Sequence, residues 1–140
     1  LAFVTTGTCT INANQAGEAS YNAAPQVQQS FAVNPAVPIA GAVSVTVSAN
    51  SSGKPITLNL SGGTATSVAV STAAAHGTAT ASGATITYTP TPGYAGPDSF
   101  TYTATNAGGT SSPGTATITV SAPTIVLPNV SLPAGTVGTR

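Results

Sequence analysis

Apolar and polar residues alternate in short runs over residues 42–121, and Gly, Pro and Asn-rich segments separate the runs. A period of two bounded by such residues is typical of half-buried antiparallel strands. No stretch keeps a helical period, so the pattern predicts an all-β fold. About seven strands are predicted, with the inward positions Val43, Val45 and Val47; Ile56, Leu58 and Leu60; Val68 and Val70; a short strand at 78–81; Ile86 and Tyr88; Phe100 and Tyr102; and Ala116, Ile118 and Val120. Seven short strands with turns between them indicate an antiparallel β-sandwich.

The clearest pattern lies between residues 84 and 106, where two alternating runs flank a segment rich in Pro and Gly. Tyr94 lies in this corner, and we expect it to bury its ring and return its hydroxyl to the backbone, as in a tyrosine corner. Asp98 is expected to cap backbone amides of the same corner, as Asx turns do. Tyr88, Phe100 and Tyr102 are expected to fill the core.

The two ends of the chain have the same alternation but too few strands to fold alone. Residues 1–33 contain a strand opened by Phe3 and continued by Cys9 and Ile11, then a polar turn and a strand ending at Val33. Residues 34–41 read as a stiff linker with two prolines. The sequence therefore predicts part of a domain at 1–33, a linker at 34–41, a complete sandwich at 42–121 and the start of a further domain at 122–140.

Charge is the most unusual feature of the composition, because charged residues make up only 3% of the 140 residues and the formal net charge is zero. Soluble domains carry about 25% charged residues, and a neutral surface favours association. With two basic residues in all, the chain lacks the basic patch that nucleic acid binding requires. No apolar run approaches the roughly 18 residues of a membrane span, so we expect no membrane insertion. This composition favours an extracellular protein held in an array.

The residue types needed for catalysis are few. Ser residues, His76 and Asp98 are present, but no Gly-x-Ser-x-Gly motif accompanies them, and the turn at His76–Gly77 explains the histidine without catalysis. Glu18 and Asp98, the two acids, fall in different predicted domains, which disfavours a glycosidase pair. One Cys and one His are too few for zinc. We therefore predict no enzyme activity and no cofactor.

An intramolecular isopeptide crosslink needs a Lys, an Asn and a buried acid. Lys54, Asn106 and Asp98 are the candidates, each placed near the end of a predicted strand. A solvated lysine at a strand end is the favoured interpretation, since lysine is rarely buried.

Three stretches carry a resemblance to bacterial tandem Ig-like repeats of large secreted and surface proteins. TCTINANQAGEASYNAAPQVQQSFAV resembles the closing half of one such repeat, and LPAGTVGT resembles the opening of another. HGTATASGATITYTPTPGYAGPDSFTYTATN resembles a cadherin-like Ig-fold repeat, with its His-Gly-Thr strand, Gly-Tyr-x-Gly-x-Asp corner and Phe-Thr-Tyr strand. The first resemblance implies that Cys9 pairs with a cysteine outside this sequence; a buried free thiol is the alternative. Cadherin-like repeats often bind calcium, but TNAGG stands where calcium-binding relatives carry aspartates.

The resemblance implies a structural module on or outside a bacterial cell, such as a spacer, a stalk or a filament subunit. Its partners would be neighbouring Ig-like domains or copies of itself, with assembly by strand complementation. One alternative is the binding module of an adhesin that recognises a glycan or a host protein, with the loop at 106–113 as a candidate. Another is an accessory domain of a secreted hydrolase.

Overall fold

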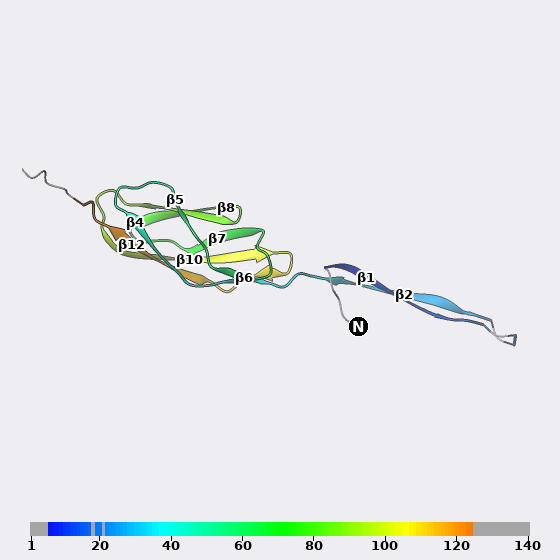
Figure 1. Cartoon of the computed structure of the whole chain (residues 1–140). Coiled ribbons are helices and arrows are strands. Elements are labelled where there is room, and N and C mark those ends of the chain that lie inside the picture. Colours follow the sequence, from blue (N-terminus) through cyan, green and yellow to red (C-terminus); the bar gives the residue numbers. More distant parts are fainter. Residues whose placement is uncertain (1–5, 18, 21, 125–140) are drawn as a thin grey trace, which may run out of the picture.

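The structure is a computed structural model that describes residues 6–17, 19–20 and 22–124. Every regular element in this part of the chain is a strand, as the alternation predicted. None of the described residues forms a helix of the length and hydrophobicity needed to cross a membrane. Figure 1 shows two regions, a sandwich and a long hairpin that projects from one end of it.

The first layer of the sandwich is organised around its longest strand, β10, which pairs with three others. Its order is β7–β10–β12–β4, and β11 adds to the end of β10. All pairs are antiparallel except β12 with β4, which is parallel and in register from Val43 opposite Ala116 to Ser48 opposite Ser121. The bounds are β4 Val43–Ser48, β7 Ser67–Thr72, β10 Gly96–Asn106, β11 Gly109–Thr110 and β12 Gly114–Ser121.

The second layer consists of two small sheets, β3–β6 and β5–β9–β8. β5 and β6 follow one another along the chain, and residues 57–59 connect the two sheets. A five-stranded sheet thus faces sheets of two and three strands, which is an Ig-like sandwich whose first strand is divided between the layers as β3 and β4. The bounds are β3 Pro38–Ala40, β5 Lys54–Ile56, β6 Leu60–Gly62, β8 Gly77–Ser82 and β9 Thr85–Pro90.

The core lies between the two layers and comes from the inward positions of the strands. β10 and β12 alternate buried and more exposed residues along almost their whole length, so each contributes every second side chain. The buried hydrophobic side chains are those of Val47, Ile56, Val68, Ile86, Tyr88, Phe100, Tyr102, Ala104, Ala116, Ile118 and Val120. The fold class predicted from the sequence, an all-β Ig-like sandwich, is confirmed.

Three details differ from the predicted strands. The run from Ile56 to Leu60 is divided into β5 and β6, and β5 pairs with β9 whereas β6 pairs with β3. β3 lies inside the predicted linker 34–41. Its first residue, Pro38, is buried, and the strand pairs with β6, so this part of the linker belongs to the sandwich. The predicted loop from Asn106 to Gly109 is a tight turn that leads into β11.

The projecting hairpin consists of β1 (Gly7–Gln15) and β2 (Ala24–Val33), paired from Gly7 opposite Val33 to Gln15 opposite Ala24. Nearly all of its side chains are exposed on both faces, and Ile11 and Val27 are 46% and 64% exposed. Phe3 and the LPAGTVGT motif lie outside the described residues. The division of the chain into parts of three domains stays a prediction.

Candidate functional site

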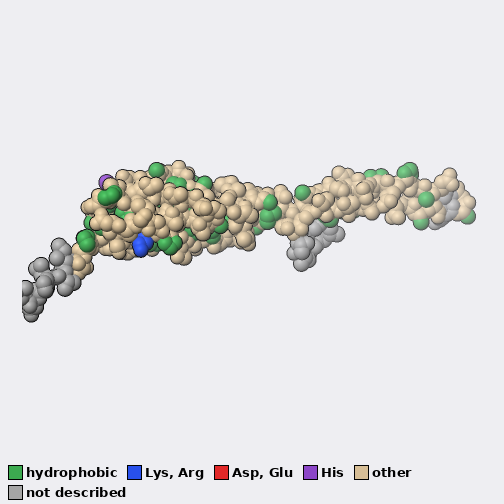
Figure 2. All heavy atoms as spheres, turned by 90° about the horizontal axis from the view of Figure 1, so that it is seen from above, with side chains coloured by type: hydrophobic (Ala, Val, Ile, Leu, Met, Phe, Trp, Pro, Cys, Tyr) green, Lys and Arg blue, Asp and Glu red, His purple; other side chains and the backbone are tan. Residues whose placement is uncertain are grey.

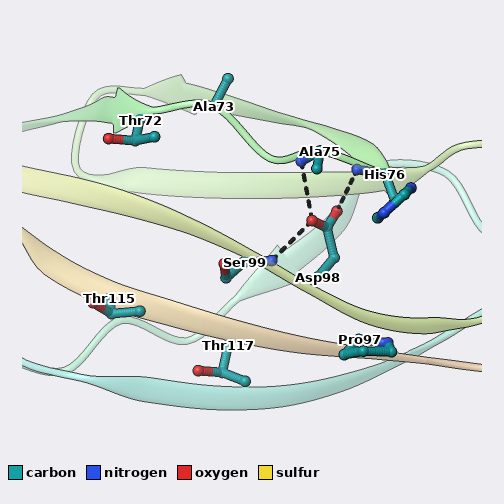
Figure 3. A pocket seen from close by; sticks show the side chains of 9 residues that line it. All are labelled: Thr72, Ala73, Ala75, His76, Pro97, Asp98, Ser99, Thr115 and Thr117. Carbon is teal, nitrogen blue, oxygen red and sulfur yellow. Dashed lines mark hydrogen bonds between the residues drawn. The ribbon is translucent and has the colours of Figure 1, made fainter.

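The densest polar cluster in the sandwich surrounds the carboxylate of Asp98, which is only 7% exposed (Figure 3). Asp98 Oδ1 accepts hydrogen bonds from the amide nitrogens of Ala75 at 3.0 Å and Ser99 at 2.8 Å. Asp98 Oδ2 accepts one from the amide nitrogen of His76 at 3.0 Å and one from the Tyr88 hydroxyl at 2.5 Å. Both oxygens are thus fully engaged, and the carboxylate joins β10 to β9 and to the segment before β8.

Burial and hydrogen bonding act in opposite directions on this carboxyl. Burial by itself raises the pKa of Asp98, but the Tyr88 hydroxyl and the three backbone amides stabilise the charged form and lower the pKa below its ordinary value. Burial, followed by the bond to Asp98, raises the pKa of Tyr88 well above its ordinary value. The pair is therefore a carboxylate with a neutral phenol, and neither group is set to exchange protons near neutral pH.

Sequence reasoning expected Asp98 to cap amides of the corner around Tyr94. Asp98 instead binds the amide of the next residue, Ser99, and the amides of Ala75 and His76 in the segment before β8. The reason is orientation: Asp98 is an inward position of β10, so its side chain is buried and meets the amides of the segment before β8.

Tyr94 occupies the corner between β9 and β10. Its hydroxyl donates to the Pro97 carbonyl at 2.5 Å, and its backbone nitrogen donates to the Thr91 carbonyl at 3.0 Å. Its ring stacks on the His76 ring with centroids 4.1 Å apart and planes within 6°. The imidazole is therefore held on a tyrosine face, while the contact of His76 with Asp98 is made by the backbone. A Ser–His–Asp relay requires the imidazole to face the acid, and this arrangement lacks that contact.

A hollow of about 630 Å³ lies beside this cluster, lined by residues of β10 and β12 and of the segment between β7 and β8. Figure 3 shows Thr72, Ser99, Thr115 and Thr117 among the residues that line it, and Asp98 with both oxygens turned toward backbone amides. The side chains of these four residues line the hollow with hydroxyl groups. No three His, Cys, Asp or Glu side chains gather anywhere within residues 6–17, 19–20 and 22–124.

Comparison with protein-family models identifies the family to which this fold belongs. A family model described as a bacterial Ig domain matches residues 22–120, well over half of the chain. The chain belongs to the bacterial Ig domain family. Comparisons with curated proteins and with solved structures find no match. The resemblance to bacterial Ig-like repeats is thereby confirmed, and domains of this kind are non-catalytic structural modules that typically occur in surface or extracellular proteins.

The bacterial Ig domain does not bring together the three residues proposed for an isopeptide crosslink. Asp98 and Asn106 lie on the same strand, eight residues apart, which separates them by about 27 Å at roughly 3.4 Å per residue. The Lys54 side chain is exposed on β5. The Asn106 amide nitrogen is engaged by the carbonyls of Ala36 at 2.8 Å and Thr64 at 3.2 Å.

These bonds of Asn106 form a clamp on the incoming chain, which sequence reasoning missed. Asn106 is 8% exposed, and its side-chain oxygen accepts from the Gly108 nitrogen at 2.8 Å. Gly63 and Gly108 let the backbone of residues 35–36 pass so closely that an added Cβ would lie 1.8 Å from the Ala36 oxygen and 2.0 Å from the Pro35 oxygen. The sequence contains the two Gly-Gly pairs at 62–63 and 108–109, but only the fold shows that the backbone of residues 35–36 passes beside them.

The other predicted structural residues of the bacterial Ig domain lie as follows. Tyr88 and Phe100 stack in the core, with ring centroids 6.3 Å apart. The Tyr102 ring is buried, and its hydroxyl donates to the Gly41 carbonyl at 2.7 Å, which holds the bend between β3 and β4. Cys9 is a partly buried free thiol on β1, opposite Phe31. Its pairing with a cysteine outside this sequence stays a prediction.

Proposed function

We propose that this bacterial Ig domain is a load-bearing spacer, part of a stalk or filament on or outside a bacterial cell. The observation that carries the proposal is the parallel pairing of β4 with β12, the first and last long strands of the sandwich. The chain enters the sandwich ahead of β4 and leaves it at the end of β12, at opposite ends (Figure 1).

Parallel terminal strands are loaded in shear when the two ends of a domain are pulled apart. β4 is drawn toward its N-terminal end and β12 toward its C-terminal end, so the strands must slide past one another. Six residue pairs link them, from Val43–Ala116 to Ser48–Ser121, and the evenly spaced bonds of a parallel ladder share the load. Peeling an antiparallel hairpin would instead break its bonds one after another.

The linker clamp supports the same role. A force that pulls on the chain before β3 acts first on Ala36 and Val37. The Ala36 carbonyl accepts a hydrogen bond from the Asn106 amide, and the Val37 carbonyl accepts one from the Gly63 nitrogen at 3.3 Å. These bonds fix the point where the chain enters the sandwich and keep the pull aligned with β4. Neighbouring Ig-like domains are the partners that this geometry suits. The open hairpin β1–β2 would be completed by strands of such a neighbour or of another copy, since a two-stranded sheet is marginal alone.

The test is single-molecule force spectroscopy on a tandem array of the chain. The Ala49 nitrogen donates to the Ser121 carbonyl, and the Ser121 hydroxyl donates to the Val47 carbonyl. Since N–H groups alternate sides along a strand, Val45 also faces β12. Val45→Pro removes one bond of the ladder and should lower the unfolding force.

Ser44→Pro is the matched control, because it puts the same ring on the same strand but removes an N–H that faces away from β12. An unfolding force that falls equally in both variants would contradict the proposal.

A second candidate function is glycan recognition by an adhesin, and the hydroxyl-lined hollow beside Ser99 and Thr117 favours it. The aromatic face at its edge is the stacked pair of His76 and Tyr94. A glycan array that gives hits with the chain, and loses them in Thr117→Val, would support this function; an array without hits would reject it.

A further inference from the structure

We propose that two copies of this chain associate side by side through the free edge of β4, with antiparallel pairing about a two-fold axis at Thr46. This proposal is independent of the load-bearing role, because a domain can pair laterally whether or not it resists tension. It follows from which edges of the sandwich are open, which backbone groups β4 presents there, and how its sequence matches itself.

The sandwich has four edge strands. Two of them, β3 and β7, carry features that block edge-to-edge contact, and β8 packs against β7 of the other layer. β7 and β8 face each other across the layers, where the Val68 nitrogen donates to the Gly83 carbonyl at 2.8 Å, and the β7–β10 ladder has an irregularity at Thr101–Tyr102. β3 has three residues and begins with Pro38. Short strands, proline and irregular pairing are the usual ways of blocking edge-to-edge contact.

β4 has none of these protections. It has six residues, VSVTVS, with regular pairing to β12 and no Pro or charged side chain. Within the described part of the chain, β12 is its single strand partner. Natural proteins usually place a lysine or another charge on such an edge, and this edge is uncharged in a chain whose surface is dominated by uncharged groups (Figure 2).

The backbone groups that face the open edge can be assigned. Ala49 and Val47 bond toward β12 through the Ser121 carbonyl and hydroxyl. Because backbone groups alternate sides, Ser44, Thr46 and Ser48 direct their N–H and C=O groups away from β12. The Ser48 carbonyl accepts the Ser51 nitrogen at 3.2 Å, which leaves its second lone pair for a partner strand. Their side chains are also exposed on the outer face of the sheet, whereas those of Val43, Val45 and Val47 turn inward.

The sequence of β4 is complementary to itself under a two-fold axis at Thr46. Antiparallel pairing then places Thr46 opposite Thr46 of the second copy and Ser44 opposite Ser48, so that all outward-facing backbone groups meet in hydrogen-bonded pairs. Val45 falls opposite Val47 on the inner face. Thr–Thr and Thr–Ser contacts stabilise such cross-strand pairs, and a closed two-fold interface of this kind uses one patch on each copy.

The first experiment measures the mass of the whole chain by sedimentation over a range of concentrations. Wild type should show a reversible dimer. Thr46→Lys places two like charges opposite each other on the axis, and like charges that meet across an interface are unfavourable. The dimer should therefore weaken by about tenfold or more, which corresponds to about 1.4 kcal/mol or more. Thr80→Lys is the matched control, because Thr80 is an exposed threonine in the middle of another edge strand, β8; it should leave the dimer unchanged.

The second experiment tests the axis itself by oxidative crosslinking in a Cys9→Ser background. Thr46→Cys should form a disulfide-linked dimer readily, because Cα atoms of directly paired residues lie about 5.5 Å apart, within disulfide range. Ser44→Cys and Ser48→Cys should each crosslink poorly alone and efficiently when mixed. A chain that stays monomeric at all concentrations, or equal crosslinking in all three variants and their mixture, would overturn the proposal.

Discussion

The sandwich and the β1–β2 hairpin have the same alternation of apolar and polar residues, yet only the sandwich converts it into a core. Ile118 on β12 is completely buried, whereas Ile11 on β1 is 46% exposed. The difference is the second layer: β12 faces the strands of the opposite sheet, and the hairpin, within the described residues, pairs only with itself. A period of two specifies which side chains share a face, and a core requires another layer on that face.

The largest effect expected from this comparison is at the two isoleucines. Ile118→Ala should lower the free energy of unfolding by about 2–5 kcal/mol, because it removes buried methyl groups and leaves a cavity. Ile11→Ala should change it by less than about 0.5 kcal/mol. Denaturant unfolding followed by circular dichroism measures both, and similar losses would mean that the hairpin is covered in solution.

The next effect concerns the buried carboxylate. Tyr88→Phe removes one donor from Asp98 and should destabilise the sandwich by about 1–3 kcal/mol. The amides of the hairpin should exchange at unchanged rates, since no hydrogen bond among the described residues links the cluster to β1 or β2. Hydrogen exchange resolved by residue gives both readouts, and a variant as stable as wild type would show that the bond between Tyr88 and Asp98 is not stabilising.

A smaller effect is expected where the two regions meet. Asn106→Ala removes the bonds to Ala36, Thr64 and Gly108 and should cost about 1–2 kcal/mol. More specifically, the amides around Val37 should exchange faster while those of β12 keep their relative protection. Unchanged exchange near Val37 would contradict a clamp at this position.

The smallest effect is a dependence on pH that belongs to the sandwich alone. Asp98 has a lowered pKa in the folded state, so its contribution to stability is present above its unfolded pKa of about 3.9 and is lost as the pH falls through the folded value. Stability should therefore decrease in this acid range. Asp98→Asn should be less stable at neutral pH and should lose most of this acid dependence. A variant with the wild-type acid slope would place the titrating group elsewhere.

Sequence reasoning predicted the fold well because the core depends on local alternation, and Ile86, Phe100 and Ile118 all occupy the inward positions assigned to them. It predicted less of the site, because several partners of Asp98 and Asn106, the amides of Ala75 and His76 and the carbonyl of Ala36, come from segments more than twenty residues away. The side chain that needs a partner is visible in a sequence. Which amide or carbonyl becomes that partner depends on how the two layers pack, and a local sequence pattern does not specify this packing.

The measurement that tests the load-bearing role most directly compares two directions of pulling on the same sandwich. In one, the load is applied through the chain before β3 and after β12, which shears β4 against β12. In the other, it is applied in a Cys9→Ser background through Thr78→Cys and Thr91→Cys, which peels β8 from β9 at the open end of their ladder. The proposed role predicts a clearly higher unfolding force in the first direction. Equal forces, or a higher force when β8 is peeled, would contradict it.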